Sequence, residues 1–334
     1  MINGHGDDAY LYSEGIRTDF SSNICPHADH SLLLAHLAEI GDRLIGHYPE
    51  PEAWSLERML AERHGISPER VIVTSGATEA IYLVAQAFRL RPVIPQPTFS
   101  EYRDACRLFP PRDRRRSVLW LCTPNNPTGE VKDIPAIKLM ARNYALTVVD
   151  QSYETYTDQP VLSPHQLEDS SNIVQLHSLT KTYAVPGLRL GYITTTASLA
   201  EVIRRYLRPW SVSALAVEAG KFLVEHQELI QHPDLAEAQR LWHALNALDG
   251  IEVLPTQTNF MLARLTAHPS PFTTHLSPFT AHLLKDYLAR RHGLLIRDAS
   301  NFLGLTPQHF RVAAQSPSEN DALVSAIKDF IQHA

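Results

Sequence analysis

Short apolar runs alternate with segments whose apolar residues recur at helical spacing through the middle of the chain, and this alternation constrains the fold more than any other feature. It is typical of a mainly parallel sheet with helices on both faces. Strands buried on both faces are apolar along their whole length, as several of these runs are. The expected strands are Val71–Thr74, Val93–Pro95, Ser117–Cys122, Leu146–Asp150, Ile173–His177 and Leu188–Ile193. The sequence therefore predicts an α/β fold.

Longer helical segments follow Tyr192 and indicate a second, smaller domain. The helices are expected around Ala197–Leu207, Ala214–His226 and Pro233–Ala247, with a strand at Thr258–Leu265. The predicted division is an N-terminal arm with part of the small domain in residues 1–45, the large domain in 46–235 and the C-terminal small domain in 236–334.

A tandem near-copy of seven residues lies in the second region, where Ser270–Leu276 reads SPFTTHL and Ser277–Leu283 reads SPFTAHL. Two units are too few for a repeat architecture, so we interpret the copy as a neutral duplication at the surface. Ser277 suits the N-cap of a helix and Pro278 its first position. We expect this helix to end at Gly293.

The charge balance argues against some functions. The 334 residues include 30 Lys and Arg against 36 Asp and Glu, a formal net charge of −6, which does not suit binding of nucleic acid through the whole surface. The one basic run, Arg112 and Arg114–Arg116, is interpreted as a solvated loop. The 17 histidines are scattered without the partners that a zinc site needs, so we expect no metal.

The cysteines and the hydropathy indicate where such a chain resides. Cys25, Cys106 and Cys122 form no CxxC pair and are expected to be reduced. The first residues, MINGHGDDAY, have neither the basic start nor the apolar run of a secretory signal. No run approaches the roughly 18 to 20 apolar residues of a membrane span. We expect a cytoplasmic protein without a membrane partner.

Polar residues gather where the predicted strands end. TSGATE, TPNNPTG, DQSY and HSLTK each follow or close one of these strands. Ligands of open α/β sheets bind at the carboxyl ends of the strands, so these segments are expected to meet in one crevice. This convergence is the main functional signal in the sequence.

Lys181, in SLTK, has the most specific chemistry. It follows a buried strand, and Arg189 comes soon after it in GLRLGY. A lysine amine can condense with an aldehyde, while Ser178 and Arg189 can hold a phosphate by hydrogen bonds and charge. Taken alone, Lys181 is a solvated loop lysine; the other motifs favour the chemical interpretation.

Two further segments suit an anion and a proton donor. Ser75–Glu79 lies between a strand and a helix, where backbone N–H groups and the helix dipole bind anions, although an ordinary capped turn is the alternative. Asp150 ends an apolar strand, where a carboxylate needs a cation or a proton donor. Asp150 is therefore either an N-cap or the counter-charge of a protonated ring nitrogen.

The set SGATEA, PTFSEY, TPNNPTG, DQSY and SLTKTYAVPGLRLGY, in this order and at these separations, resembles the fold-type I pyridoxal-phosphate enzymes. Within that superfamily the chain is similar to the class I/II aminotransferase group, which includes histidinol-phosphate aminotransferases and threonine-phosphate decarboxylases. The resemblance covers nearly the whole chain. It implies pyridoxal 5'-phosphate as cofactor, a three-layer large domain with a mainly parallel, mixed sheet, and a smaller α+β domain from the N- and C-terminal segments.

The resemblance implies roles for individual residues, with Lys181, Asp150 and Tyr153 expected to be catalytic. Lys181 matches the lysine that holds the cofactor and moves protons at the substrate α-carbon, and Asp150 matches the acid that keeps the pyridine nitrogen protonated. Asn126 and Tyr153 match the pair at the ring 3-oxygen. Tyr102 matches the aromatic side chain stacked on the ring, with a core tyrosine as the alternative. The residues that match the phosphate site are Gly76, Ala77, Thr78, Ser178 and Arg189.

Substrate and subunit contacts are implied in the same way. Arg311 matches an arginine that grips the substrate carboxylate, a bidentate task that suits a guanidinium, and Arg297 matches a second arginine near the distal phosphate. Surface ion pairs are the alternative for both. Asn23 and His5 match residues near the substrate. Tyr48 matches a tyrosine that reaches the cofactor phosphate of the neighbouring subunit, which implies a homodimer with shared sites.

The finer resemblance is to threonine-phosphate decarboxylases, through GHG at His5, FSSNICP, RPWSVSALA and LLIRDASNFLGL. It implies decarboxylation of L-threonine O-3-phosphate to (R)-1-amino-2-propanol O-2-phosphate in cobalamin synthesis. A histidinol-phosphate or related aminotransferase is the alternative, and a non-catalytic protein that keeps the fold is a third. One departure is Gln151 after Asp150, where relatives often carry Glu.

Overall fold

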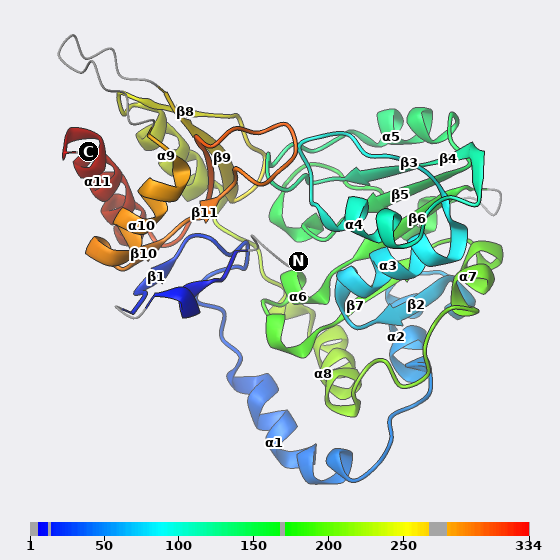
Figure 1. The fold of residues 1–334 in the computed structure, drawn as a ribbon. Coiled ribbons are helices and arrows are strands. Elements are labelled where there is room, and N and C mark those ends of the chain that lie inside the picture. The colour runs from blue at the N-terminus through cyan, green and yellow to red at the C-terminus, as the bar shows by residue number, and fades with distance from the viewer. Residues whose placement is uncertain (1–5, 13–14, 168–170, 267–278, 334) are drawn as a thin grey trace.

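The computed structural model describes residues 6–12, 15–167, 171–266 and 279–333, and a six-stranded sheet forms the centre of its larger part (Figure 1). In spatial order its strands are β2 (Val71–Thr74), β7 (Gly191–Thr194), β6 (Ile173–His177), β5 (Leu146–Asp150), β4 (Asp113–Cys122) and β3 (Leu90–Val93). Strands β3 to β6 run parallel, and β7 is antiparallel to both β6 and β2. The predicted α/β fold with a mainly parallel, mixed sheet is confirmed.

Helices cover both faces of this sheet, because successive strand residues point to opposite sides and both sides are apolar. Trp120 and Val148 pack in one cluster, and their neighbours Leu121 and Val149 pack in another on the opposite face. The first face is covered by α3 (Gly76–Phe88), α4 (Glu101–Leu108) and α7 (Ala197–Arg204), and the second by α2 (Trp54–His64), α5 (Ile134–Ala141) and α8 (Ala214–Glu225). This part of the chain therefore has three layers.

A four-stranded antiparallel sheet lies in the C-terminal part. In spatial order its strands are β11 (Arg297–Asp298), β12 (His309–Ala313), β9 (Phe260–Leu265) and β8 (Ile251–Val253). The helices that share its core are α9 (Leu235–Asn246), α10 (Ala281–His292) and α11 (Pro317–His333). Phe310 of β12 and Leu284 of α10 are fully buried in this core, so the sheet and its helices form one hydrophobic unit.

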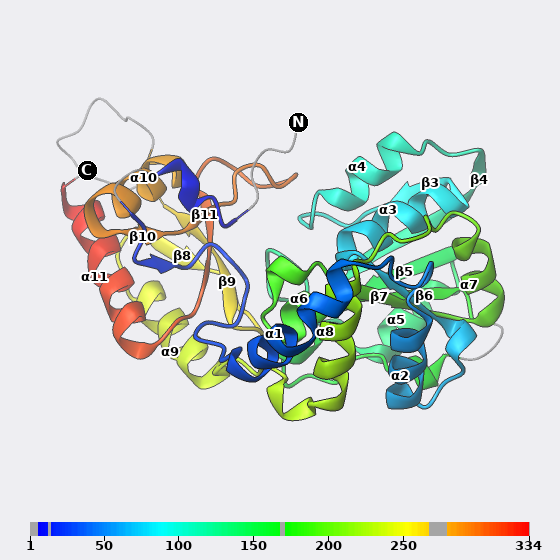
Figure 2. The ribbon, with the colours of Figure 1, turned by 90° about the horizontal axis from the view of Figure 1, so that it is seen from below.

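The start of the chain joins this C-terminal unit. Strand β1 (Thr18–Asp19) pairs in parallel with β10 (Leu294–Leu295), and Phe20 is buried in the same core. Helix α1 (Ser31–Ile45) then crosses to the larger part, where it packs on α8 (Figure 2). Segments from both ends of the chain thus build the smaller unit, whereas the residue boundaries of the domains stay a prediction.

Short helices complete the connections. Helix α6 (Leu179–Thr182) follows β6, and the 3-10 helices are η1 (Ala9–Leu11), η2 (Pro68–Arg70), η3 (Glu154–Tyr156), η4 (Pro164–Gln166), η5 (Pro186–Leu188) and η6 (Gln227–Leu229). The predicted helices after Tyr192 are confirmed as α7, α8 and α9, each ending within a few residues of its expected bound.

Four predicted strands have wrong bounds: β4 begins at Asp113 and not at Ser117, β9 begins at Phe260 and not at Thr258, and β3 and β7 are displaced. Strand β3 ends at Val93, where the predicted strand began, because Pro95 and Pro97 have no N–H to continue the ladder. Strand β7 begins at Gly191 and not at Leu188. The residues before it form η5. Arg189 has a left-handed conformation (φ +55°), which does not fit a strand, so extended backbone begins only after it.

The basic run and the predicted capping of one helix also need correction. Arg114–Arg116 are exposed, as expected, but they belong to β4 and not to a loop. They lack the apolar pattern of the buried half of that strand. Helix α10 begins at Ala281, and the hydroxyl of Thr280 accepts from the Leu283 N–H (3.2 Å), so Thr280 is the N-cap and not Ser277. The predicted end at Gly293 is confirmed. Residues 267–278, which hold most of the tandem copy, lie outside the described part.

Candidate active site

A cavity of about 330 Å³ lies at the carboxyl ends of β4, β5 and β6. Its walls come from three sources: the N-terminal segment, the large sheet with its helices, and the C-terminal sheet. The predicted site residues that line it are Asn23, Ala77, Thr78, Tyr102, Asn126, Asp150, Tyr153, Ser178, Lys181, Arg189, Arg297 and Arg311. The expected convergence of the strand-end segments is thus confirmed.

Asp150 lies at the end of β5 and is 4% exposed. Its carboxylate accepts the Tyr102 hydroxyl (2.7 Å) and, from Ser152, both the N–H (2.9 Å) and the hydroxyl (2.6 Å). Burial raises the pKa of Asp150, while the hydrogen bonds from Ser152 and Tyr102 favour the ionised form. A carboxylate held in this way can pair with a protonated group in the cavity.

The amino end of α3 and Arg189 form an anion site. Gly76 has φ +81°, and a Cβ on it would lie 2.8 Å from Nη2 of Arg189. A Cβ on Gly191 would lie 2.6 Å from the Ala77 nitrogen. Glycine at both positions therefore lets Arg189 and β7 approach the first turn of α3. Ala77 and Thr78 line the cavity at this positive helix end, where a phosphate is favoured.

Lys181 lies in α6, directly after the strand end that carries Ser178. Its Nζ is 5.7 Å from the centroid of the Tyr153 ring. Burial lowers the pKa of the amine to about 7, and the positive charges of Arg311 and Arg189 act in the same direction. A large fraction of the amine is therefore neutral near neutral pH, and a neutral amine is a nucleophile and a base.

Tyr153 and Asn126 lie on one side of the lysine. The Tyr153 ring contacts Phe260 edge-on (4.9 Å between centroids), and burial raises the pKa of its hydroxyl to about 12. Asn126 Oδ1 accepts from Nη1 of Arg311 (2.5 Å). This bond fixes the Asn126 amide and orients the guanidinium toward the cavity.

The structure places Tyr102 in the wall of the cavity. It is 1% exposed, its ring stacks on Trp120 (5.5 Å between centroids, 22°), and its hydroxyl donates to Asp150. Phe99, in the same PTFSEY segment, also lines the cavity and meets the Tyr102 ring edge-on (5.8 Å). Phe99 is thus a second candidate for the stacked aromatic side chain, and its position in the predicted motif could have revealed it.

Two arginines and one asparagine also line the cavity. Arg311 and Arg297 are both 5% exposed. Arg297 donates to Asn301 Oδ1 (2.8 Å), and burial together with the charge of Arg311 lowers its pKa to about 10. Arg311 donates to the Ser21 carbonyl, and its Nε has no partner in the described chain. Both amide atoms of Asn23 are also buried without a partner there. Buried polar groups are usually hydrogen-bonded, so these unsatisfied groups favour binding of a polar ligand.

Two of the described predicted residues, Tyr48 and Gly76, do not line this cavity. The side chain of Tyr48 is 85% exposed and contacts the Trp210 ring (5.5 Å between centroids) on the surface. His5 lies outside the described residues. Gly76 lies against the Arg189 guanidinium, where a Cβ would be 2.8 Å from Nη2.

Asp7 lines the cavity but was missing from the predicted set. It has a left-handed backbone (φ +63°), and its N–H donates to the Ser21 hydroxyl (2.9 Å). Burial raises the pKa of its carboxyl, and the Lys181 amine opposes this shift. No periodicity marks Asp7, and its place beside the GHG segment was the one available signal.

The described ranges hold neither a metal-binding cluster nor a helix that could span a membrane. There, His, Cys, Asp and Glu side chains form no group of three that could hold a metal ion. None of the helices in these ranges has both the length and the apolar character that crossing a bilayer requires.

The comparisons with known proteins agree with this geometry. The sequence pattern of the family described as "Aminotransferase class I and II" matches residues 16–110 and 108–327. A threonine-phosphate decarboxylase from Salmonella typhimurium is 30% identical over 94% of this chain and 91% of its own. A histidinol-phosphate aminotransferase from Archaeoglobus fulgidus is 26% identical over 86% of this chain and 85% of its own.

A solved structure extends the likeness to three dimensions. The L-threonine-O-3-phosphate decarboxylase from Porphyromonas gingivalis superimposes with a TM-score of 0.86 and 34% identity, covering 94% of this chain and 99% of that one. The chain therefore belongs to the class I and II aminotransferase family of pyridoxal-phosphate enzymes, and it has their fold-type I architecture.

The residues present fit pyridoxal phosphate. Lys181 can hold the aldehyde, the α3 amino end with Arg189 can hold the phosphate, and Asp150 can pair with the ring nitrogen. Gly76 has φ +81°, which residues with a side chain rarely adopt, and without a Cβ it lets the Arg189 guanidinium approach the start of α3. The buried, unpartnered amide of Asn23 adds a polar group that the chain itself does not satisfy.

Proposed function

We propose that the protein decarboxylates L-threonine O-3-phosphate to (R)-1-amino-2-propanol O-2-phosphate. The observation that carries this proposal is the pair of buried guanidiniums, Arg297 and Arg311, in one wall of the cavity that holds Lys181. Within the described residues neither guanidinium forms an ion pair with a carboxylate of the chain. Two such groups favour a substrate with two anionic groups, as a phosphorylated amino acid has.

The relatives support the same substrate class. Both the Salmonella relative and the Porphyromonas structure bear the name of a decarboxylase of threonine phosphate. Their identities of 30% and 34%, over more than nine-tenths of this chain, exceed the 26% of the Archaeoglobus aminotransferase.

The roles of the residues follow from their positions. Pyridoxal phosphate, when bound, supplies a ring that accepts electrons from the substrate α-carbon. Asp150 would keep a proton on the ring nitrogen, and Tyr153 and Asn126 would hold the ring oxygen. Lys181, with its pKa near 7, can give a proton to the α-carbon and regain one at neutral pH.

The two arginines decide which bond breaks. The bond that lies perpendicular to the ring is the one that is cleaved, and the grip on carboxylate and phosphate sets that angle. We propose that Arg311, anchored by Asn126 and the Ser21 carbonyl, orients the carboxylate, and that Arg297 binds the phosphate. Asn23 contributes its free amide to the same substrate.

A histidinol-phosphate aminotransferase is the second candidate, because the Archaeoglobus relative covers most of the chain and the cofactor site serves either reaction. The test compares kcat/KM for L-threonine O-3-phosphate with that for histidinol phosphate plus 2-oxoglutarate. We expect the first to exceed the second by at least about a hundredfold. The reverse order would assign the protein to the aminotransferases.

We also propose a homodimer with shared sites. Tyr48 does not line the cavity of its own chain, and large apolar side chains are exposed along α1, at the start of α2 and at the Trp210 that Tyr48 contacts: Leu32, Leu34, Ile45, Trp54 and Trp210. An exposed group of this kind on α1 and the adjoining loops is typical of a protein interface. A second copy that covers it could receive Tyr48 at its cofactor phosphate.

A further inference from the structure

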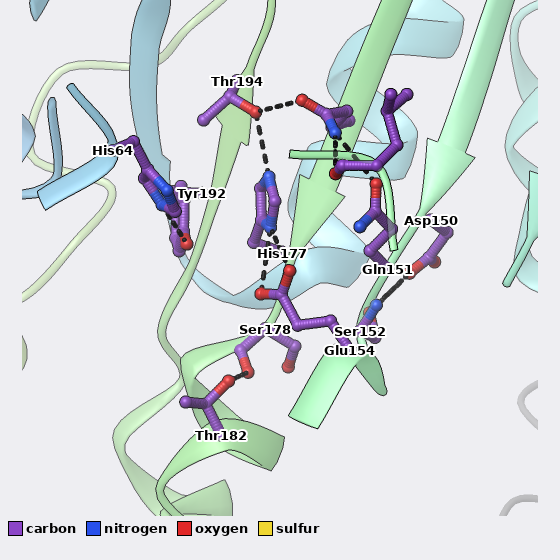
Figure 3. Close-up of polar contacts among 12 residues, drawn as sticks. His64, Asp150, Gln151, Ser152, Glu154, His177, Ser178, Thr182, Tyr192 and Thr194 are labelled. Carbon is purple, nitrogen blue, oxygen red and sulfur yellow. Dashed lines mark hydrogen bonds and ion pairs between the residues drawn. The ribbon is translucent and has the colours of Figure 1, made fainter. Parts of the chain in front are cut away.

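A buried polar network lies behind the segment that carries Ser178 and Lys181 (Figure 3). His177, the last residue of β6, precedes Ser178, so its side chain lies on the opposite side of the strand from the cavity. The ring is 0% exposed. Its Nδ1 lies 3.1 Å and 3.2 Å from the two carboxylate oxygens of Glu154, and its Nε2 lies 2.9 Å from the Thr194 hydroxyl.

The partners of the network fix where its protons lie. Gln175 donates through Nε2 to the Leu162 carbonyl (2.6 Å) and to Gln151 Oε1 (2.9 Å). Its Oε1 therefore accepts the hydroxyl proton of Thr194 (3.0 Å). Because Thr194 has one proton and donates it there, its oxygen must accept from Nε2 of His177.

The other ring nitrogen faces a carboxylate. When Glu154 is ionised it only accepts hydrogen bonds, and Nδ1 of His177 must then also carry a proton, which makes the ring an imidazolium. The charge of His177 lowers the pKa of Glu154 despite burial, in agreement with an ion pair. The Tyr192 ring stacks on His177 (4.5 Å between centroids, 10°), a face that suits a cation.

We propose that His177 is a protonated positioning residue whose ion pair with Glu154 fixes the β6–α6 turn and whose charge favours the ionised form of Asp150. The pair joins two segments of the site. Glu154 follows the strand that ends in Asp150, and His177 precedes the turn that carries Lys181. The effect on Asp150 rests on the role proposed for that residue above.

Asp150 pairs with Leu176 across β5 and β6, so His177 lies on the neighbouring strand one residue beyond this pair. Burial raises the pKa of Asp150, and the positive charge of His177 is one of the influences that lower it. The titratable and charged groups around His177 are Glu154 from η3, Tyr192 from β7, His64 and Arg63 from α2, and Asp150 from β5. Burial and the charge of His177 lower the pKa of His64 to about 4, so His64 stays neutral and serves as a control.

The protonation state is tested by nitrogen NMR of the apoprotein labelled with ¹⁵N-histidine. At about pH 7 we expect His177 to give an imidazole signal with both nitrogens protonated. Its signals should disappear in His177→Gln and persist in His64→Gln. In Glu154→Gln they should become those of a neutral ring with one protonated nitrogen. Signals of a neutral tautomer for His177 in the wild type would overturn the proposal.

The effect on Asp150 is tested by titrating the absorption of bound pyridoxal phosphate. Loss of the His177 cation raises the pKa of Asp150. In His177→Gln the midpoint of the absorption change at acid pH should therefore move to higher pH by on the order of one unit. In His64→Gln it should not move. An unchanged midpoint in a folded His177→Gln variant would contradict this part, and Glu154→Gln replaces that variant if it does not fold. If the wild type binds no pyridoxal phosphate, the proposed function fails, while NMR still decides the charge of His177.

Discussion

Lys181 shares its cavity with three arginines, and its partial burial is what separates it from a surface lysine. The same burial opposes folding. Because the pKa of the amine falls to about 7 from an ordinary 10.5, the unfolded chain binds more protons between these values. The free energy of unfolding therefore rises with pH across that window, and the full cost is present below about pH 7.

We predict that Lys181→Met stabilises the apoprotein at about pH 6 by about 3 kcal/mol, and that the gain shrinks by more than half at about pH 9. Urea unfolding of both proteins at the two pH values measures this difference. Lys138→Met, at an exposed position of α5, is the matched control and should show no such trend. A gain independent of pH would mean that the amine is not desolvated.

Among single residues, those that lie within a sequence motif could be predicted as site residues. Lys181, Asp150, Asn126 and Arg311 were all expected, and the structure brings them into one cavity. Motifs do not specify side-chain direction, so the contact of Tyr102 with Trp120 was not predictable. The remaining roles stay predictions.

The junction of β7 with α3 shows how an element positions the site. A Cβ on Gly191 would meet three backbone atoms, at 2.6 Å from Ala77 N, 2.7 Å from Gly76 C and 2.9 Å from His177 O. Backbone atoms cannot rotate away as side chains do, so the strand or the helix must shift. That shift would displace the amino end of α3 from the proposed phosphate position.

We predict that Gly191→Ala lowers the free energy of unfolding by about 2 kcal/mol and weakens pyridoxal-phosphate binding at least about tenfold. Calorimetry and a cofactor titration measure the two effects. In Gly187→Ala, where a Cβ meets no atom within 4 Å, both values should stay near those of the wild type. Equal behaviour of the two variants would refute the close-approach argument.

The elements that the sequence predicted well are those with a buried, regular pattern. Strands β2, β5 and β6 were placed with the right bounds, since every residue in them is buried. Strand β4 was cut short because its first half is exposed and basic. Edge strand β3 was displaced because Pro92 lies inside it, a position that only an edge tolerates.

At the scale of the whole molecule, a site shared between subunits predicts the activity of dimers formed from two different inactive variants. If Tyr48 serves the neighbouring site, a subunit with Lys181→Ala can supply Tyr48 to a subunit with Tyr48→Ala, whose own Lys181 is intact. Each heterodimer then has one complete site.

We predict that the two variants, nearly inactive alone, recover about a quarter of the wild-type activity after unfolding and refolding together in equal amounts. Activity and light scattering of the mixture measure this recovery. The same variants mixed without refolding are the control. A refolded mixture no more active than the mean of its components would show that each site is built within one chain.

The central claim is that this site breaks the bond to the carboxylate. The most direct test is to incubate the cofactor-loaded protein with L-threonine O-3-phosphate labelled with ¹³C in the carboxyl group, in D₂O with 2-oxoglutarate present. We predict release of ¹³CO₂ in equal amount to 1-amino-2-propanol O-2-phosphate carrying one deuterium at the former α-carbon, with no glutamate. Retention of the label in a 2-oxo acid, with glutamate formed, would contradict the account and establish transamination.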